Sequence, residues 1–283
     1  MRVIRWFFMS LKTLIIFDYS GTLSLEAPLF AAPKTLMKYV EATGLRDFGI
    51  DSPRIFWEQF VNPTWVAGST TPAGYKKVLL ERMIALLHPE APLNRRAALA
   101  GAVSAFVDRY FGHSRIDARW KPLLRRINAH PSARAVIATD HYAEATGAII
   151  SFLGDWQIEA VPATGAVSNP QTAAFIVANS ADLGVHKADP RFWQILKARL
   201  HLGAMRLILI IDDFGYNEQG ADDYSRRHRV ETRMKETVRT LETVFSAAVE
   251  VFPVMIGADA KDRGTRLEAL IADAAAAIGR HLV

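Results

Sequence analysis

Short apolar runs without alternation constrain the fold of this chain more than any other feature. A polar residue or cluster follows most of them directly. Such runs are typical of strands that are covered on both faces, as in a parallel sheet. Helix-like segments separate the runs, and this alternation predicts a doubly wound α/β fold. We expect strands at residues 14–17, 135–138, 174–177, 207–211 and 249–256, the last at a sheet edge because it contains Pro253.

The long segment between the first two runs has no convincing strand. Apolar residues such as Leu79 and Met83 recur there at helical spacing. We therefore expect a Rossmann-like three-layer core with a parallel sheet, formed by residues 1–27 and 118–283, and an inserted α-helical cap at residues 28–117. The cap helices are expected at residues 32–43, 54–60, 75–87 and 93–111, and the core helices at 120–129, 141–153, 190–202 and 229–247. Residues 62–74 are rich in Gly, Pro, Ser and Thr and are expected to form a loop.

The composition excludes several classes of protein. Half of the 283 residues are hydrophobic and 22% are charged, so the chain folds around a core rather than staying disordered. The absence of cysteine excludes disulfides, thiolate metal sites and cysteine nucleophiles. The net charge of +5 comes from 34 basic and 29 acidic residues that are interspersed along the chain. No basic stripe interleaved with aromatic residues is present, so no nucleic-acid partner is expected.

The first residues are basic and then apolar, which superficially suggests a signal peptide. No small-residue cleavage site follows, Lys12 interrupts the apolar run and Asp18 ends it. We interpret residues 1–10 as a short extension and residues 13–17 as the first strand. No run has the length that a membrane-spanning helix needs. We expect a soluble, cytoplasmic protein without a membrane partner, whose oligomeric state stays open.

The turn after the first strand carries the first candidate site residue. Asp18 leaves a buried strand and enters a turn that contains Gly21, where its carboxylate is placed to attack a substrate at the sheet edge. The N–H groups of this turn and the Thr22 hydroxyl are suited to bind an anion. Ligands of doubly wound sheets bind beyond the carboxyl ends of the strands, which is where this turn lies.

Three later segments add chemistry at the same edge. Thr139 closes the second strand with a hydroxyl donor, and Lys187 supplies a positive charge just before a helix. Asp212 and Asp213 close a further strand, with Asn217 just beyond. Each feature alone is more often structural than functional, but their common position at strand ends favours a single site. Packed carboxylates repel one another unless a hard cation lies between them, and an all-oxygen ligand set favours Mg²⁺.

In these segments the chain resembles the haloacid dehalogenase (HAD) superfamily. The family's first motif, Asp-x-Asp-Gly-Thr, stands here as Asp-Tyr-Ser-Gly-Thr at residues 18–22, and Thr139 matches the second motif. The third, Gly-x-x-Lys-Pro-Asp-Pro, stands at residues 184–190 with Ala188 in place of the first Pro. The fourth, Asp-Asp-x-x-x-Asn, stands at residues 212–217. The resemblance runs from residue 13 to about residue 221, and the insert corresponds to a C1-type cap.

The resemblance implies a Mg²⁺-dependent phosphatase of a small anionic metabolite, with Asp18 as the nucleophile that forms an aspartyl intermediate. Lys187 and Thr139 would hold the phosphoryl group, and Ser20 would ligate the metal through its carbonyl. The metal would also bind Asp18 and one of the paired aspartates, with a slight preference for Asp213 over Asp212. Further substrate contacts would come from Gly21, Thr22, Thr139 and Asn217.

Ser20 departs from the family pattern. Phosphatases of this family have an aspartate at this position, which protonates the leaving group and then activates water. A serine hydroxyl cannot supply the roughly 10²- to 10⁴-fold acceleration of general acid–base catalysis. The chain is then a phosphatase with another acid or a good leaving group, an enzyme of another branch, or a non-catalytic binding protein.

Two other branches are considered. Phosphonatases use a Schiff-base lysine from the cap, for which Lys76 and Lys77 are candidates, although two lysines at a helix start are usually only solvated. Dehalogenases of the family need no metal, and the complete fourth motif argues against them. His141, two residues after Thr139, is a further candidate acid or base, with a hydrogen bond at the helix start as the simpler interpretation.

Overall fold

The protein is described by a computed structural model, which places residues 13–87, 89–130, 133–165, 175–202, 205–218, 227–256 and 262–282. The N-terminal extension expected at residues 1–10 lies outside these described residues. In the described segments, no helix combines the length and the apolar character that crossing a bilayer requires.

A single parallel sheet of six strands organises the described residues, in the order β3-β4-β2-β1-β5-β6. The strands are β1 (Thr13–Phe17), β2 (Arg134–Thr139), β3 (Ala160–Pro162), β4 (Phe175–Asn179), β5 (Leu207–Asp212) and β6 (Ala248–Pro253). The expected α/β class and the edge position of the last strand are confirmed. The sequence reading missed β3, a three-residue edge strand that is too short to form an apolar run.

Helices cover both faces of the sheet. They are η3 (Ala118–Trp120), α7 (Lys121–Asn128), α8 (Glu144–Gly154), α9 (Ser180–Leu183), α10 (Pro190–Arg199), α11 (Arg227–Phe245) and α12 (Arg263–His281). Alternate strand residues point to opposite faces: Ile15 and Phe17 pack with α7, α8 and α12, whereas Leu14 and Ile16 pack with α10 and α11. Burial on both faces explains why the strands lack polar alternation.

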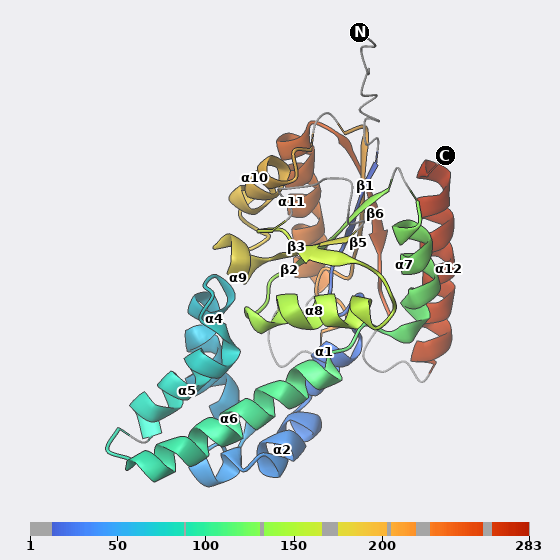
Figure 1. The fold of residues 1–283 in the computed structure, drawn as a ribbon. Coiled ribbons are helices and arrows are strands. Elements are labelled where there is room, and N and C mark those ends of the chain that lie inside the picture. The colour runs from blue at the N-terminus through green and yellow to red at the C-terminus, as the bar shows by residue number, and fades with distance from the viewer. Residues whose placement is uncertain are drawn as a thin grey trace.

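The segment between β1 and β2 is helical in the structure, as expected. Its helices are α1 (Glu26–Phe30), α2 (Pro33–Ala42), η1 (Leu45–Phe48), α3 (Pro53–Ile55), η2 (Phe56–Val61), α4 (Asn62–Ser69), α5 (Gly74–Leu87) and α6 (Leu93–His113). Helices α2, α4, α5 and α6 lie together at one end of the sheet, far from both labelled termini (Figure 1). One buried apolar cluster runs from the sheet face into these helices. The division into a core and a cap of residues 28–117 stays a prediction.

The prediction of a loop at residues 62–74 is wrong for its first part, because residues 62–69 form helix α4. Pro63 stands in the first turn of α4, where the missing N–H costs no hydrogen bond within the helix. The wide π-type turn η2 leads directly into it. The composition therefore predicted a loop where a proline only begins a new helical segment.

Candidate active site

The carboxyl ends of β1 and β5 bring three aspartates together. These strands are neighbours in register, with Phe17 opposite Ile211, and the amide of Asp18 donates to the Ile211 carbonyl at 2.9 Å. Asp212 ends β5, and Asp213 follows it. One carboxylate oxygen from each aspartate lies within 4.8 Å of those of the other two, and all three residues are buried. This is the clustering of carboxylates that the strand ends predicted.

Lys187 enters this cluster from the loop between α9 and α10. Its Nζ lies 2.5 Å from Oδ1 of Asp18 and 3.5 Å from Oδ2 of Asp212. The backbone of the same residue is held on both sides: its N–H donates to Oδ1 of Asp140 at 2.8 Å, and its carbonyl accepts from Nε1 of Trp193 at 2.8 Å. The ammonium is therefore placed between two strand ends by a fixed loop.

The electrostatics of the cluster follow from burial. Burial raises the pKa of Asp18 to about 7, against the opposing effect of Lys187. Burial and the charge of Asp18 also raise the pKa of Asp213 well above its usual range. For Lys187, burial by itself lowers the pKa, but the carboxylates of Asp18, Asp212 and Asp140 raise it well above the ordinary value. The lysine is thus held as a cation among carboxylates that resist ionising together.

The donor set fits a divalent cation. The cluster holds three carboxyl groups, and Lys187 pairs with two of them, so acidic groups outnumber this ammonium and a divalent ion would offset the excess. All the candidate ligands are oxygens, as Mg²⁺ prefers.

The turn after β5 holds both of its aspartates with backbone N–H groups. Oδ1 of Asp212 accepts from the amide of Phe214 at 2.6 Å. Asp213 accepts twice, on Oδ1 from Gly215 at 3.1 Å and on Oδ2 from Asn217 at 2.7 Å. Both oxygens of Asp213 therefore accept from backbone amides, whereas Asp212 has one oxygen on an amide and the other, Oδ2, 3.5 Å from Nζ of Lys187.

Gly21, Thr22 and Asn217 join the turns after β1 and β5. The Thr22 hydroxyl is fully buried and accepts from the amide of Asp213 at 2.9 Å. Asn217 donates from Nδ2 to the carbonyls of Gly21 and Val254, at 2.7 and 2.5 Å. Gly21 has a φ of +82°, and a Cβ there would lie 2.4 Å from Oδ2 of Asp213. These residues hold the turns together, while their substrate contacts stay predictions.

Thr139 and Ser20 lie in the same region. Thr139 is the last residue of β2, the neighbour of β1, and it is buried. Ser20 is half-buried and forms a bridge with Ser24 within the turn after β1. Their roles toward phosphate and metal stay predictions.

Asp140 is a site residue that the sequence reasoning missed. It follows Thr139, accepts from the amide of Lys187, and burial raises its pKa. A signal was present, because an aspartate directly after a strand-ending threonine stands at the same edge as Asp18. The partner that gives Asp140 its role lies 47 residues away in the chain, and no local pattern indicates it.

His141 forms contacts with the insert rather than with the aspartate cluster. Its Nδ1 accepts from the amide of Tyr142 at 2.9 Å, and its Nε2 lies 2.7 Å from the hydroxyl of Tyr110 on α6. Burial lowers the pKa of His141 to about 4. The neutral imidazole with a proton on Nε2 satisfies both contacts, which supports the structural interpretation of this residue.

Lys76 and Lys77 both pair with acidic residues of the insert. Nζ of Lys76 lies 2.6 Å from Oδ1 of Asp108 on α6, and Nζ of Lys77 lies 3.9 Å from Oε1 of Glu81 on α5. The side chain of Lys76 is 40% exposed and that of Lys77 is 63% exposed. Exposed, ion-paired ammonium groups lack the desolvation that activates a Schiff-base lysine.

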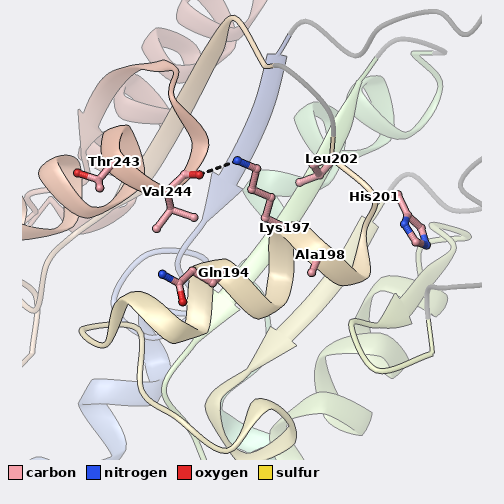
Figure 2. A pocket seen from close by; sticks show the side chains of 7 residues that line it. All are labelled: Gln194, Lys197, Ala198, His201, Leu202, Thr243 and Val244. Atoms are coloured by element: carbon pink, nitrogen blue, oxygen red, sulfur yellow. Dashed lines mark hydrogen bonds between the residues drawn. The ribbon is translucent and has the colours of Figure 1, made fainter.

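A separate surface pocket lies between α10 and α11 (Figure 2). Its lining contains none of the predicted site residues. Lys197 lies in it but donates to the Val244 carbonyl at 2.7 Å, near the end of α11. This lysine therefore provides a hydrogen-bond donor for a carbonyl at the C-terminal end of α11, and the pocket is not part of the candidate site.

No protein-family model matches the chain, and no curated protein is significantly similar to it. Among solved structures, the crystal structure of a 2-haloacid dehalogenase from Pseudomonas syringae pv. tomato DC3000 is similar, with 16% sequence identity and a TM-score of 0.47. The match covers 81% of this chain and 99% of that chain. A likeness this distant does not assign a reaction. By the order and position of its four motifs on a parallel sheet, the chain resembles the haloacid dehalogenase superfamily.

Proposed function

We propose that this protein is a Mg²⁺-dependent hydrolase of a small phosphorylated metabolite and acts through an aspartyl-phosphate at Asp18. The observation that carries the proposal is the 2.5 Å contact between Nζ of Lys187 and Oδ1 of Asp18, within a buried cluster of three carboxylates. A carboxylate beside a fixed ammonium, at the carboxyl end of a parallel sheet, is suited to attack an anionic group that the ammonium also attracts.

In the proposed reaction a carboxylate oxygen of Asp18 attacks phosphorus. The new Asp18 O–P bond forms as the bond from phosphorus to the leaving oxygen breaks, and the electron pair stays on that oxygen. Water then attacks the phosphorus of the aspartyl-phosphate, the Asp18 O–P bond breaks with its electron pair left on the carboxylate, and both protons of the water leave with inorganic phosphate. Lys187 offsets negative charge on the phosphoryl oxygens, and the Thr139 hydroxyl donates a hydrogen bond to them.

Asp18 and Asp212 are the side chains best placed to hold the metal, together with the carbonyl of Ser20. Asp213 accepts from backbone amides on both carboxylate oxygens and is more deeply buried than Asp212, whose Oδ2 faces Lys187 beside Asp18, so Asp212 rather than Asp213 is the proposed ligand. When bound, Mg²⁺ neutralises phosphoryl charge and allows the carboxylate and the phosphate to approach each other.

Ser20 restricts the substrate class. Without an acid at this position, the leaving oxygen departs as an anion unless another group protonates it. We therefore propose a substrate with an acidic leaving group, such as an acyl or enol phosphate, in preference to an alkyl phosphate. The half-exposed, ion-paired Lys76 and Lys77 give the phosphonatase alternative no support.

The test compares phosphate release from acyl, aryl and alkyl phosphates, with and without Mg²⁺, for the wild type and Asp18→Asn. The matched control is Asp51→Asn, the same chemical change at an exposed residue. We expect metal-dependent release that favours acidic leaving groups and is lost only in Asp18→Asn. Absence of release from every phosphate, by a folded protein, would overturn the proposal.

Displacement of halide from a 2-haloacid is the second candidate. Ser20 favours it, because attack of Asp18 on carbon with loss of halide requires no proton donor at this position. Chloride release from 2-chloropropionate in the presence of EDTA would select this reaction. Strict dependence on Mg²⁺ would exclude it.

A further inference from the structure

Arg233 on α11 holds the turn after β5, which carries Asp212 and Asp213. Its Nε and Nη2 both donate to the carbonyl oxygen of Phe214, at 2.9 and 2.6 Å. Phe214 is the first residue after the aspartate pair, and Arg233 is 19 residues further along the chain. A planar guanidinium that presents two N–H groups to one oxygen restrains the direction of that carbonyl more strongly than one flexible donor.

The peptide between Phe214 and Gly215 connects this contact to the acidic cluster. The C=O and N–H of a planar trans peptide point in opposite directions. The carbonyl side of this peptide accepts from Arg233, and its N–H side donates to Oδ1 of Asp213 at 3.1 Å. The orientation of a single peptide plane therefore links the guanidinium to a buried carboxylate.

The backbone of this turn has a conformation that needs such support. Phe214 has a φ of +51° and Gly215 a φ of +77°. A left-handed conformation is uncommon for a bulky residue with a side chain, and it persists where surrounding contacts hold it. The amide of Phe214 also donates to Oδ1 of Asp212 at 2.6 Å. A change in this turn would therefore disturb both aspartates.

We propose that Arg233 is a positioning residue for the acidic cluster: by fixing the Phe214–Gly215 peptide, it holds Asp213 in the turn and orients Asp212 to bind a divalent cation. It acts through the backbone and touches neither substrate nor metal. The metal part rests on the proposed function, whereas the orientation of the turn does not. Partners that orient the ligands of a metal typically change its affinity by about 10- to 100-fold when they are removed.

The test uses three variants of the full chain. Arg233→Met removes the donors and the charge but keeps an extended side chain. Arg233→Lys keeps the charge but lacks the planar pair of N–H donors. Arg96→Met is the matched control, because Arg96 also donates from Nε and Nη2 to backbone carbonyls, those of Ala91 and Pro89, in the insert. Circular dichroism establishes that each variant is folded.

The first readout is the dissociation constant for Mg²⁺ or Mn²⁺, measured by calorimetry without substrate. We expect it to rise about 10-fold or more in Arg233→Met, to rise less in Arg233→Lys, and to stay within about twofold in Arg96→Met. A folded Arg233→Met protein with wild-type affinity would overturn the proposal.

The second readout is hydrogen exchange of the amides of Gly215 and Asn217, which donate to Asp213. We expect faster exchange in Arg233→Met and unchanged exchange in Arg96→Met. A wild-type protein that bound neither cation would contradict the proposed metal dependence, and hydrogen exchange would then decide on Arg233 by itself. Unchanged exchange at both amides would overturn the positioning role.

Discussion

Ser69 and His186 join the helical insert to the loop that carries Lys187. The Ser69 hydroxyl donates to the Trp65 carbonyl at 2.6 Å and lies 2.7 Å from Nε2 of His186, from which it accepts. Ser180 donates to the Ser69 carbonyl at 2.6 Å, and the Trp65 ring stacks on the imidazole with an angle of 13° between the planes. The end of α4 is therefore bonded to the residue next to the proposed phosphate-binding lysine.

We expect Ser69→Ala to reduce the free energy of unfolding by about 1 kcal/mol, because it removes a hydrogen bond from a fully buried position and leaves the His186 N–H without this acceptor. Urea unfolding measures the loss. Ser104→Ala is the control, since Ser104 on α6 is only half-buried and its hydroxyl donates to the Asp108 side chain at 3.3 Å. Equal stability of both variants and the wild type would contradict a bonded α4–core contact.

Ser20→Asp tests the missing acid. If proton transfer to the leaving group limits turnover, a carboxyl group at this position should raise hydrolysis of alkyl phosphates by about 100-fold or more, since general acid–base catalysis contributes roughly 10²- to 10⁴-fold. Steady-state kinetics with one alkyl and one aryl phosphate measure the gain, which should be smaller for the aryl ester. Ser20→Asn is the control for side-chain size. An unchanged or lower rate with the alkyl ester would count against Ser20 as the cause.

The buried His141 predicts a pH dependence of stability. Burial lowers its pKa to about 4 in the folded protein, against about 6.5 in an unfolded chain. The unfolded state therefore binds more protons between these values, and the free energy of unfolding should fall as the pH falls. Between about pH 7.5 and pH 5 this loss amounts to about 2 kcal/mol.

His141→Gln removes the titrating group, so its stability should change less with pH than that of the wild type. Urea unfolding at a series of pH values gives the difference between the two slopes. His228→Gln, at an exposed residue of α11, is the matched control and should keep the wild-type slope. Parallel curves for the wild type and His141→Gln would refute this explanation.

Gly68 is required by the packing of α4 against Tyr142. A Cβ at this position would lie 2.5 Å from Cε1 of Tyr142. This ring stacks on Tyr75 at 4.0 Å and meets Trp65 edge to face, so moving it would disturb both contacts. We expect Gly68→Ala to destabilise the protein by about 1 to 3 kcal/mol.

Gly101→Ala is the matched control for this prediction. Gly101 lies within α6, and a Cβ there has no neighbour within 4 Å among the described residues. Since alanine is the better helix former, this variant should gain up to about 1 kcal/mol. Thermal unfolding of the two variants should therefore shift in opposite directions. A shift in the same direction would show that α4 and Tyr142 are not packed as closely as described.

Local pattern predicted five strands of the sheet and the meeting of carboxylates at its edge, but not the three-residue edge strand β3. Strands such as β1 and β5 are buried on both faces, so they must be apolar throughout, and this is visible in the sequence. Parallel strands also end at a common edge, so polar residues after them, such as Asp18 and Asp212, come together. The residue types at this edge then indicate the chemistry.

Tertiary structure alone decided how those residues are held. Three contacts at the site and its supports join residues that are far apart in the chain. They are Arg233 with Phe214 (19 positions apart), Asp140 with Lys187 (47) and Ser69 with His186 (117). Contacts at such separations depend on how helices and loops pack, and no periodicity records them. The sequence by itself determined the buried strands, most of the helices and the aspartates that follow β1 and β5, because burial and backbone preference are local. The packing of α4, α10 and α11 against the sheet decided which partners restrain those side chains, because it brings distant donors and acceptors within hydrogen-bond distance.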